Sequence, residues 1–536
     1  MKNKFDLLIL FWIISIASLL LKVAGEESKG KITVKYNTSS EYNCDKFSPV
    51  NDFVTRNKDT MTFNNTSDGE IEIEFQKDFL DFSKFFETAF SNSKNCITSI
   101  EFSEMKITGI TNMENMFSNM KKLEKIVGLG SLNTSSVINM NSMFKGDYFL
   151  KSLNLSNFDT SKVTDMSYMF YSNIMLNEID VSSFRTSKVI NMEYMFANDY
   201  QIFELIENPD MYSDKLGYNF TLQKRKIKGL FNFDTSSVIN MDGMFSFNIY
   251  IESLDLSNFN TSSVTSMEYM FGFVGIESLD LSNFNTSSVT SMESMFNKAS
   301  IKSLDLSNFN TSSVIYMDSM FEGDSIKSLD LSNFNTSSVT SMKYMFASTS
   351  IKSLDLSNFD TSSVTNFYRM FYSCQSLEYL DITNFNMINN KISYDSFLYG
   401  LDKIKYINIY NIQQNQNEDF TKYIKEIQFG HDGLMICQKE EIIDHGTNIC
   451  CSINFDDIKC SNFIIVYYKS SITYNNGFAK DEQDKDNIYR KDISFVFDGN
   501  SKVENNETIT INENTPIKIY FSKPMTSFKN FFSNIY

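Results

Sequence analysis

The sequence predicts an α+β repeat solenoid, a stack of short parallel strands and short helices, followed by a small disulfide-containing β-rich domain. Three observations support this. A segment of about 25 residues recurs almost letter for letter, starting at Ile251, Ile276, Ile301, Ile326 and Ile351. A tandem Met-Phe pair keeps the same period over a longer stretch, and four of the seven cysteines cluster later, between residues 437 and 460. A fixed period of this size is typical of stacked repeat arrays.

The first element is an N-terminal signal peptide, expected over residues 1–25. Lys2 and Lys4 precede an apolar stretch at residues 7–21, and small residues follow it before Glu26. This order is that of a secretory signal peptide. The stretch is shorter than the ~20 residues that a spanning helix needs, so an uncleaved anchor is the weaker alternative. We expect a secreted, extracellular protein, or one displayed at the cell surface, with no transmembrane span in the mature chain.

The cysteines and the glycosylation sequons agree with that compartment. An oxidising environment favours disulfides, in a connectivity that the sequence does not decide. The candidate disulfide cysteines are Cys44, Cys96, Cys437, Cys450, Cys451 and Cys460. The candidate glycosylated asparagines, each followed by x-Ser or x-Thr, are Asn37, Asn64, Asn65, Asn133, Asn154, Asn219, Asn260, Asn285, Asn310, Asn335 and Asn506.

The repeats are expected to follow a cap. Residues 26–96 form this N-terminal cap segment, and residues 97–386 form an array of about ten repeats of 25 to 27 residues. The spacing of the Met-Phe pairs is interrupted once, which indicates an insertion at about residues 206–229. An insertion into one repeat is expected to emerge as a loop on one face of the array.

Each repeat is expected to contain a strand, a polar turn and a short helix. Leu254 and Leu256 alternate with polar residues, which predicts a strand with one buried face. The polar turn follows at residues 260–263. Residues 265–268 then read Thr-Ser-Met-Glu, which has the form of a capping box, and apolar residues at helical spacing continue to Phe271. The stripes of Met and Phe are expected to form the core.

The repeat resembles that of the BspA-type leucine-rich repeat surface proteins. The resemblance is carried by the LDLSNFDTSSVT sequence of residues 354–365 and the Met-Phe pair at 370–371. It implies a leucine-rich-repeat-like stack in a secreted or cell-surface protein, for which adhesion is the role usually proposed. One departure concerns the ladder asparagine of ordinary leucine-rich repeats. Phe259 stands in its place and Asn258 lies one residue earlier, so we do not assume that ladder.

Two segments follow the array. Residues 387–491 contain strand-like runs rich in Tyr and Ile and four cysteines, which predicts the Cys-containing β-rich domain. The hydrophobic residues at 71–86, just before the array, have a characteristic spacing. The same spacing recurs at residues 517–532, within the last segment, residues 492–536. We therefore expect residues 492–536 to be the start of a second cap and array module, truncated at the end of the chain.

Composition and motifs argue against nucleic-acid binding and catalysis. The net charge is −18, and the one compact basic run, residues 224–228, is expected to lie in a solvated loop. The chain has no nucleophile elbow, P-loop or dinucleotide fingerprint. His431 and His445 lie among cysteines, but the spacings match no standard zinc site. We expect no enzyme activity, no metal site and no cofactor.

The candidate binding face is a column of aspartates, one in each of five repeats. In-register parallel strands lie ~4.8 Å apart, which would place these side chains next to one another. The column consists of Asp255, Asp280, Asp305, Asp330 and Asp355. One interpretation is a solvated acidic stripe, screened by flanking serine hydroxyls. The alternative is a binding face for Ca²⁺ or a cationic ligand, because hard cations favour carboxylate oxygens.

These features favour non-catalytic macromolecular recognition or adhesion. A solenoid presents an extended surface rather than an enclosed reactive pocket. The expected partner is a protein or a glycan on a cell or matrix surface. The alternative is a glycosylated structural spacer in a cell wall or in a secreted multi-module assembly.

Overall fold

The computed structural model describes a defined set of residues, which divide into two compact units, residues 1–288 and 289–536. The described residues are 29–37, 48–50, 61–67, 69–91, 93–200, 224–386, 393, 395–409, 435–437, 447–450, 463–468, 472–474, 493–497, 501–503, 509–511 and 516–521. The predicted signal peptide, residues 1–25, lies outside them.

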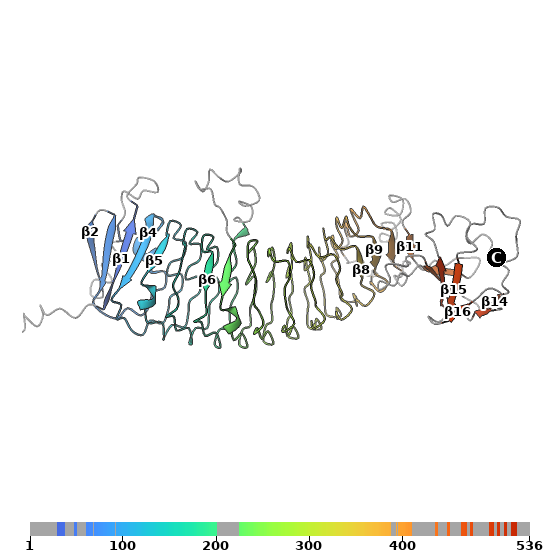
Figure 1. Ribbon diagram of the computed structural model, residues 1–536, viewed down its shortest axis with the longest axis horizontal. Helices are drawn as coiled ribbons and strands as arrows, with labels where there is room; N and C mark the ends of the chain where they lie inside the picture. The colour runs from blue at the N-terminus through green and yellow to red at the C-terminus, as the bar shows by residue number, and fades with distance from the viewer. Residues whose placement is uncertain are drawn as a thin grey trace, which may run out of the picture. The chain divides into compact units, whose positions relative to one another are not determined.

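The first unit begins with a cap that changes from antiparallel to parallel pairing (Figure 1). Strand β1 (Gly30–Tyr36) pairs antiparallel with β3 (Glu70–Phe75) and with β4 (Ile97–Ser103), and β3 pairs with β2 (Met61–Ser67). Strand β4 then pairs parallel with β5 (Lys125–Val127), where the repeats begin. Alternate residues of β3 are buried, as expected for a strand with one face on the core.

Parallel pairing links repeats in two ways, by short strands in some repeats and by single bridges. The strand expected at Leu254 and Leu256 does not form, since these residues are assigned to no strand. In the first unit, β6 (Glu178–Asp180) pairs with β7 (Lys226–Lys228). In the second unit, β8 (Ser353–Asp355), β9 (Tyr379–Asp381), β10 (Tyr406–Asn408) and β11 (Met435–Cys437) pair in register. A second ladder of single bridges links each repeat to the next in the first unit through Asp81, Asn112, Asn139, Asp165, Asn191, Asn240 and Ser266, and in the second through Ser291, Tyr316, Ser341, Asn366 and Ser393.

The prediction of a short helix in each repeat is wrong, so the array is a β-solenoid rather than an α+β stack. No α-helix lies in the described Met-Phe segments, which are turns. Tyr269 and Phe273 have φ of 55° and 56°, a left-handed conformation that ends any helical run. The Glu268 N–H bonds to the Asp242 carboxylate of the preceding repeat, at 2.8 Å, instead of completing a capping box. The apolar residues nevertheless have helix-like spacing. The reason is that the turns contain hydrogen bonds to the third preceding residue, such as Met270 N–H to Met267 O at 3.3 Å, and these also place both methionines in the core.

The core is a stack of phenylalanines, as the Met-Phe pairs predict. In the first unit the Phe117 and Phe144 rings lie 5.3 Å apart and within 2° of parallel. In the second unit Phe346 lies 5.7 Å from both Phe321 and Phe371. All five side chains are fully buried. Cys374, inside one of these repeats, is a buried free thiol.

Two ladders of polar side chains join successive repeats. The hydroxyl of buried Thr311 donates to the Asn335 carbonyl at 2.9 Å and accepts the Asn335 N–H at 2.8 Å. The Asn333 side-chain amide donates to the carbonyls of Leu306 and Phe309 in the preceding repeat, at 2.9 and 3.0 Å. An asparagine ladder therefore exists at the position one residue early, which the sequence analysis did not assume.

Replacing Thr311 by Val is expected to lower the free energy of unfolding by about 2 kcal/mol, because both backbone groups of Asn335 lose their partner in a buried site. Chemical denaturation measures the loss. Ser338→Ala is the matched control, since that exposed hydroxyl makes one bond, to the Ser312 carbonyl at 3.0 Å. Equal losses in the two variants would show that the threonine ladder does not stabilise the stack.

The remaining elements are short helices and the strands that follow the repeats. Strand β13 pairs with both β12 and β18, so strands from the predicted Cys-containing domain and from residues 492–536 share one antiparallel sheet. These elements are α3 (Phe85–Phe90), the 3₁₀ helices η2 (Lys94–Cys96), η3 (Leu129–Ser131) and η4 (Leu230–Asn232), and strands β12 (Thr447–Cys450), β13 (Phe463–Tyr468), β14 (Ile472–Tyr474), β15 (Ile493–Phe497), β16 (Ser501–Val503), β17 (Ile509–Ile511) and β18 (Pro516–Phe521).

Three features of the array differ from the expectations, two at its boundaries and one in the basic run. The single bridges begin at Asp81, before the expected start of the array at residue 97. Parallel pairing continues to β11, beyond the expected end at residue 386. The basic run was expected in a solvated loop, but its residues 226–228 form β7, a strand of the array, because Ile227 points into the core with charged residues on either side.

Candidate functional site

The predicted aspartates lie on an exposed surface in both units. Asp255 and Asp280 are exposed in the first unit, and Asp305, Asp330 and Asp355 in the second. In the second unit β8 pairs in register with β9, which sets Asp355 opposite Asp381 of the next repeat.

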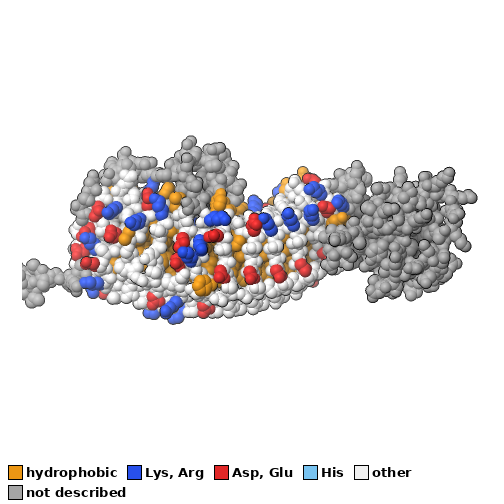
Figure 2. Space-filling view, in the orientation of Figure 1, with side chains coloured by type: hydrophobic (Ala, Val, Ile, Leu, Met, Phe, Trp, Pro, Cys, Tyr) orange, Lys and Arg blue, Asp and Glu red, His pale blue; other side chains and the backbone are white. Residues whose placement is uncertain are grey.

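The second unit also carries a column of lysines on these repeats. Lys302, Lys327 and Lys352 are exposed and stand three residues before the aspartates. Figure 2 shows basic and acidic side chains in separate rows along one face of the repeats. We call this surface, made of Lys302, Lys327, Lys352, Asp305, Asp330 and Asp355, the strand face.

Each aspartate of the strand face also shapes its own turn. The Oδ1 of Asp305 accepts the N–H of Ser307 at 2.9 Å, and Asp330 and Asp355 make the same contact with the serine two residues on. The backbone and hydroxyl hydrogen bonds from Ser307 lower the pKa of Asp305. Those from the Ser332 hydroxyl and backbone lower the pKa of Asp330, although neighbouring Asp305 acts in the opposite direction. Hydrogen bonds therefore keep this pair of carboxylates ionised despite their mutual repulsion.

The metal-ligating residues named from the sequence are only partly described. Within the described ranges, no group of three or more His, Cys, Asp or Glu side chains is placed to hold a metal ion. His431 and His445 lie outside those ranges. Cys437 and Cys450 belong to β11 and β12, whose side chains are not described.

The candidate modification sites divide in the same way. The described sequon side chains are all exposed, namely Asn37, Asn64, Asn133, Asn154, Asn260, Asn285, Asn310 and Asn335. The Asn65 side chain, Asn219 and Asn506 lie outside the description. Cys96 is buried and disulfide-bonded, whereas Cys44, Cys451 and Cys460 are not described.

A column of buried polar residues was not predicted from the sequence. It occupies the position three residues after the phenylalanine of the Met-Phe pair, and includes Asp147, Asn173 and Asn248 in the first unit and Asp324 in the second. Burial raises the pKa of Asp324 to about 8, although its carboxylate accepts backbone N–H groups of Ser325 and Ile326. The signal in the sequence was a polar residue recurring at one fixed place after an apolar pair.

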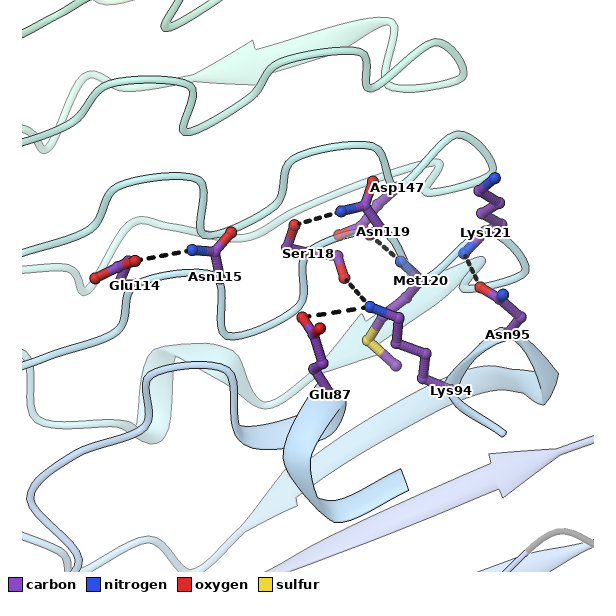
Figure 3. A network of polar contacts seen from close by, with 10 residues as sticks. All are labelled: Glu87, Lys94, Asn95, Glu114, Asn115, Ser118, Asn119, Met120, Lys121 and Asp147. Atoms are coloured by element: carbon purple, nitrogen blue, oxygen red, sulfur yellow. Dashed lines mark hydrogen bonds and ion pairs between the residues drawn. The ribbon is translucent and has the colours of Figure 1, made fainter. Parts of the chain in front are cut away.

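The buried carboxyl of Asp147 joins the first two repeats, next to contacts that join the first repeat to the cap (Figure 3). Its Oδ1 accepts the Met120 N–H at 2.9 Å, and burial raises its pKa well above the ordinary value. Nearby, Lys94 Nζ lies 3.5 Å from a Glu87 carboxylate oxygen and donates to the Ser118 carbonyl at 3.4 Å. These contacts tie α3 and η2 to the first coil, so they serve the stability of the stack.

Arg225, in the basic run, is buried and structural rather than ligand-binding. Its guanidinium donates to Asn248 Oδ1 at 3.0 Å and to the Asn173 carbonyl at 2.5 Å. Burial lowers its pKa to about 10. These contacts fix the chain where it re-enters the array after the insertion.

Aromatic residues gather at the turns that carry the Met-Phe pairs, and the sequence analysis missed them too. In the first unit Lys145 Nζ lies 4.2 Å from the Tyr168 ring centroid, and Tyr168 stacks on Tyr194 at 5.2 Å. In the second unit, tyrosines surround Arg369. The tyrosines and the arginine come from different repeats and from several positions of the repeat, so no single position of the repeat indicates the cluster.

The fold and these surfaces define a β-solenoid repeat protein with a charged strand face and aromatic turns. The chain belongs to the family described as "Mycoplasma protein of unknown function, DUF285", whose model matches residues 83–208, 214–325 and 300–407, more than half of the chain. Neither the curated proteins nor the solved structures contain a match. Within the described part of the chain, no helix has the length and apolar character needed to cross a membrane.

Proposed function

We propose that the protein is a secreted or cell-surface protein of non-catalytic macromolecular recognition, in the manner implied by its resemblance to the BspA-type surface proteins. The observation that carries this proposal is the strand face. Its columns of lysine and aspartate repeat from coil to coil and are exposed. Regular charges on an extended surface suit recognition of a macromolecule by complementary charge.

The backbone beneath the strand face supports this role because it is fixed. Strand β8, which ends at Asp355, pairs with β9, and the turns after Asp305 and Asp330 are closed by the serine N–H bonds to these carboxylates. The side chains of the strand face therefore start from defined positions, and a partner that matches them loses little free energy in ordering the protein. The predicted signal peptide supports export of the chain.

A glycosylated spacer is the second candidate function, and the exposed sequons favour it. Neighbouring sequon asparagines such as Asn310 and Asn335 lie on consecutive coils, since Thr311 contacts the Asn335 backbone. Coils ~4.8 Å apart leave too little width for a glycan on every one. A spacer of this kind would therefore carry glycans on some of these asparagines only.

Binding of the purified full chain to a panel of glycans and surface proteins tests the proposed function. The panel is probed with calcium and then with EDTA. Binding to at least one class of molecule is expected. Loss of that binding in EDTA would add a cation to the strand face, whereas retention would assign recognition to the protein side chains. A folded chain that binds nothing on the panel would contradict recognition and favour the spacer.

A further inference from the structure

A cluster of tyrosine rings around an arginine lies in the second unit, at turns of neighbouring repeats. Arg369 stands among tyrosine rings, with its Cζ 4.8 Å from the Tyr372 centroid, 5.0 Å from Tyr368 and 5.9 Å from Tyr344. Tyr372 in turn stacks on Tyr399 of the next repeat, at 5.5 Å and 13° from parallel. We call these five residues the Tyr–Arg cluster. Distances of this size are those of cation–π contacts.

The cluster is accessible and its cation is only partly used. Tyr399 is 63% exposed, and the other four side chains are partly exposed. A guanidinium has five N–H donors. The structure records one hydrogen bond from the Arg369 side chain, Nη1 to the Tyr344 hydroxyl at 3.2 Å. Its Nε is buried and out of reach of a ligand, so the donors left for a ligand are on Nη1 and Nη2. The rings thus hold the arginine in place while leaving donors for a ligand.

The backbone of these turns is closed to an added strand. The N–H of Tyr344 bonds to the Tyr368 carbonyl at 3.0 Å, and the Arg369 N–H to the Asp395 carbonyl at 3.1 Å. The Ser373 N–H bonds to the Tyr399 carbonyl at 2.7 Å. A peptide that binds by strand addition needs free groups of this kind. A ligand of the cluster must instead be recognised by its side chains.

We propose that the Tyr–Arg cluster binds an acidic glycan, a polysaccharide that carries carboxylate or sulfate groups. A tyrosine offers a flat apolar face and a hydroxyl, which suit the C–H face and the hydroxyls of a sugar ring. The planar guanidinium of Arg369 suits a carboxylate or sulfate through paired hydrogen bonds. Lys343 Nζ, 5.5 Å from the Tyr344 centroid, adds a second cation. Two carboxylates lie nearby, Asp318, whose Oδ1 accepts the Lys343 N–H at 2.9 Å, and Asp395, whose charge acts on Tyr368.

The net negative charge of the whole chain means that any binding of an acidic glycan must come from a local site such as the Tyr–Arg cluster. At a net charge of −18 the protein repels polyanions in general, so binding of one requires a specific cationic site. The inference rests on the proposed recognition function and names a ligand class for it, at a surface separate from the strand face.

Direct binding measurements with defined polymers test the inference. Calorimetric titration of the full chain uses polygalacturonate for carboxylates, dextran sulfate for sulfates and dextran as the neutral control. Poly-glutamate tests an acidic peptide. The expected result is binding of one or both acidic polysaccharides and no binding of dextran. Binding of poly-glutamate alone would overturn the glycan assignment in favour of a peptide.

Variants that the fold already accommodates locate the site. Arg369→Ser introduces the residue that Ser294 and Ser319 provide at the same turn position, where φ is also positive. Tyr372→Ala introduces the residue that Ala347 provides at its position in the preceding repeat. Arg185→Asn removes one exposed cation from the first unit and is the control for charge. Because it creates an Asn-Thr-Ser sequon, all of these proteins are made in a host without N-glycosylation.

Arg369→Ser is expected to weaken binding of the acidic polysaccharide about tenfold or more, and Tyr372→Ala to weaken it severalfold. Arg185→Asn should bind as the unaltered chain does. Unchanged binding by Arg369→Ser, or failure of a folded chain to bind either acidic polysaccharide, would overturn the inference. Binding to other molecules of the recognition panel would in that case leave the proposed function standing.

Discussion

Replacing Phe346 by Ala is expected to lower the free energy of unfolding by about 4 kcal/mol. Phe346 is fully buried between Phe321 and Phe371, with both ring centroids 5.7 Å away. The substitution removes apolar surface, leaves a cavity and interrupts the stack on both sides. Because each repeat contacts its immediate neighbours, one gap weakens two interfaces between coils. Chemical denaturation followed by circular dichroism measures the loss.

Ile315→Ala is the matched control for the stacked phenylalanine. Ile315 is an apolar residue of a neighbouring repeat, and it is 36% exposed. Its truncation is expected to cost less than about 1 kcal/mol, because little apolar area leaves a buried site. If Phe346→Ala cost no more than Ile315→Ala, the phenylalanine stack would not be the core of the second unit.

Replacing Asp324 by Asn is expected to stabilise the protein by about 4 kcal/mol at pH 7. Burial raises the pKa of Asp324 from 3.8 to about 8. Between those two values the unfolded chain has lost this proton and the folded chain retains it, so stability falls as the pH rises. An amide removes this dependence, keeps an oxygen for the Ser325 N–H bond of 2.8 Å, and already occurs at this position as Asn173 and Asn248.

Denaturation at several pH values tests the Asp324 prediction. The advantage of Asp324→Asn should shrink as the pH falls and vanish near pH 3, where the carboxyl is protonated in both states. Asp355→Asn, on an exposed carboxylate of the same unit, is the control and should show no comparable gain. An advantage that is independent of pH, or a destabilised variant at pH 7, would show that Asp324 is not held in its neutral form.

The sequence predicted the repeat and the core, but not the path of the chain in the second half of each coil. Leu256, Met267, Met270 and Phe271 are buried as their periodicity indicates. The same spacing fits a helix and a turn whose bonds reach the third preceding residue, so periodicity alone could not separate the two. The left-handed residue was hidden because Tyr269 occupies it, whereas glycine is the usual marker of a positive φ.

The candidate surfaces were predicted unevenly for a physical reason. The aspartate column follows directly from the repeat, since one register places every copy. Its role in the turns also has a sequence signal, because Asp followed two residues on by Ser favours a side-chain bond to the backbone. The Tyr–Arg cluster has no such signal. Arg369 stands where Ser294 and Ser319 stand in other repeats, and its ring partners come from separate coils.

Matched triple variants offer the most direct test of recognition by the strand face. In the first, Asp305, Asp330 and Asp355 become Asn, which keeps the oxygen that accepts the serine N–H. In the control, three aspartates outside the strand face become Asn, the residue that other repeats carry there; they are Asp159, Asp234 and Asp360. Both variants lose the same charge. Every one of these substitutions creates an Asn-x-Ser sequon, so the proteins are made in a host without N-glycosylation.

The measurement is the affinity of the unaltered chain and of both variants for one molecule that the panel identifies. We expect the strand-face variant to bind about tenfold more weakly or worse, and the control to bind as the unaltered chain does. Equal affinity of the two variants would contradict recognition through the strand face.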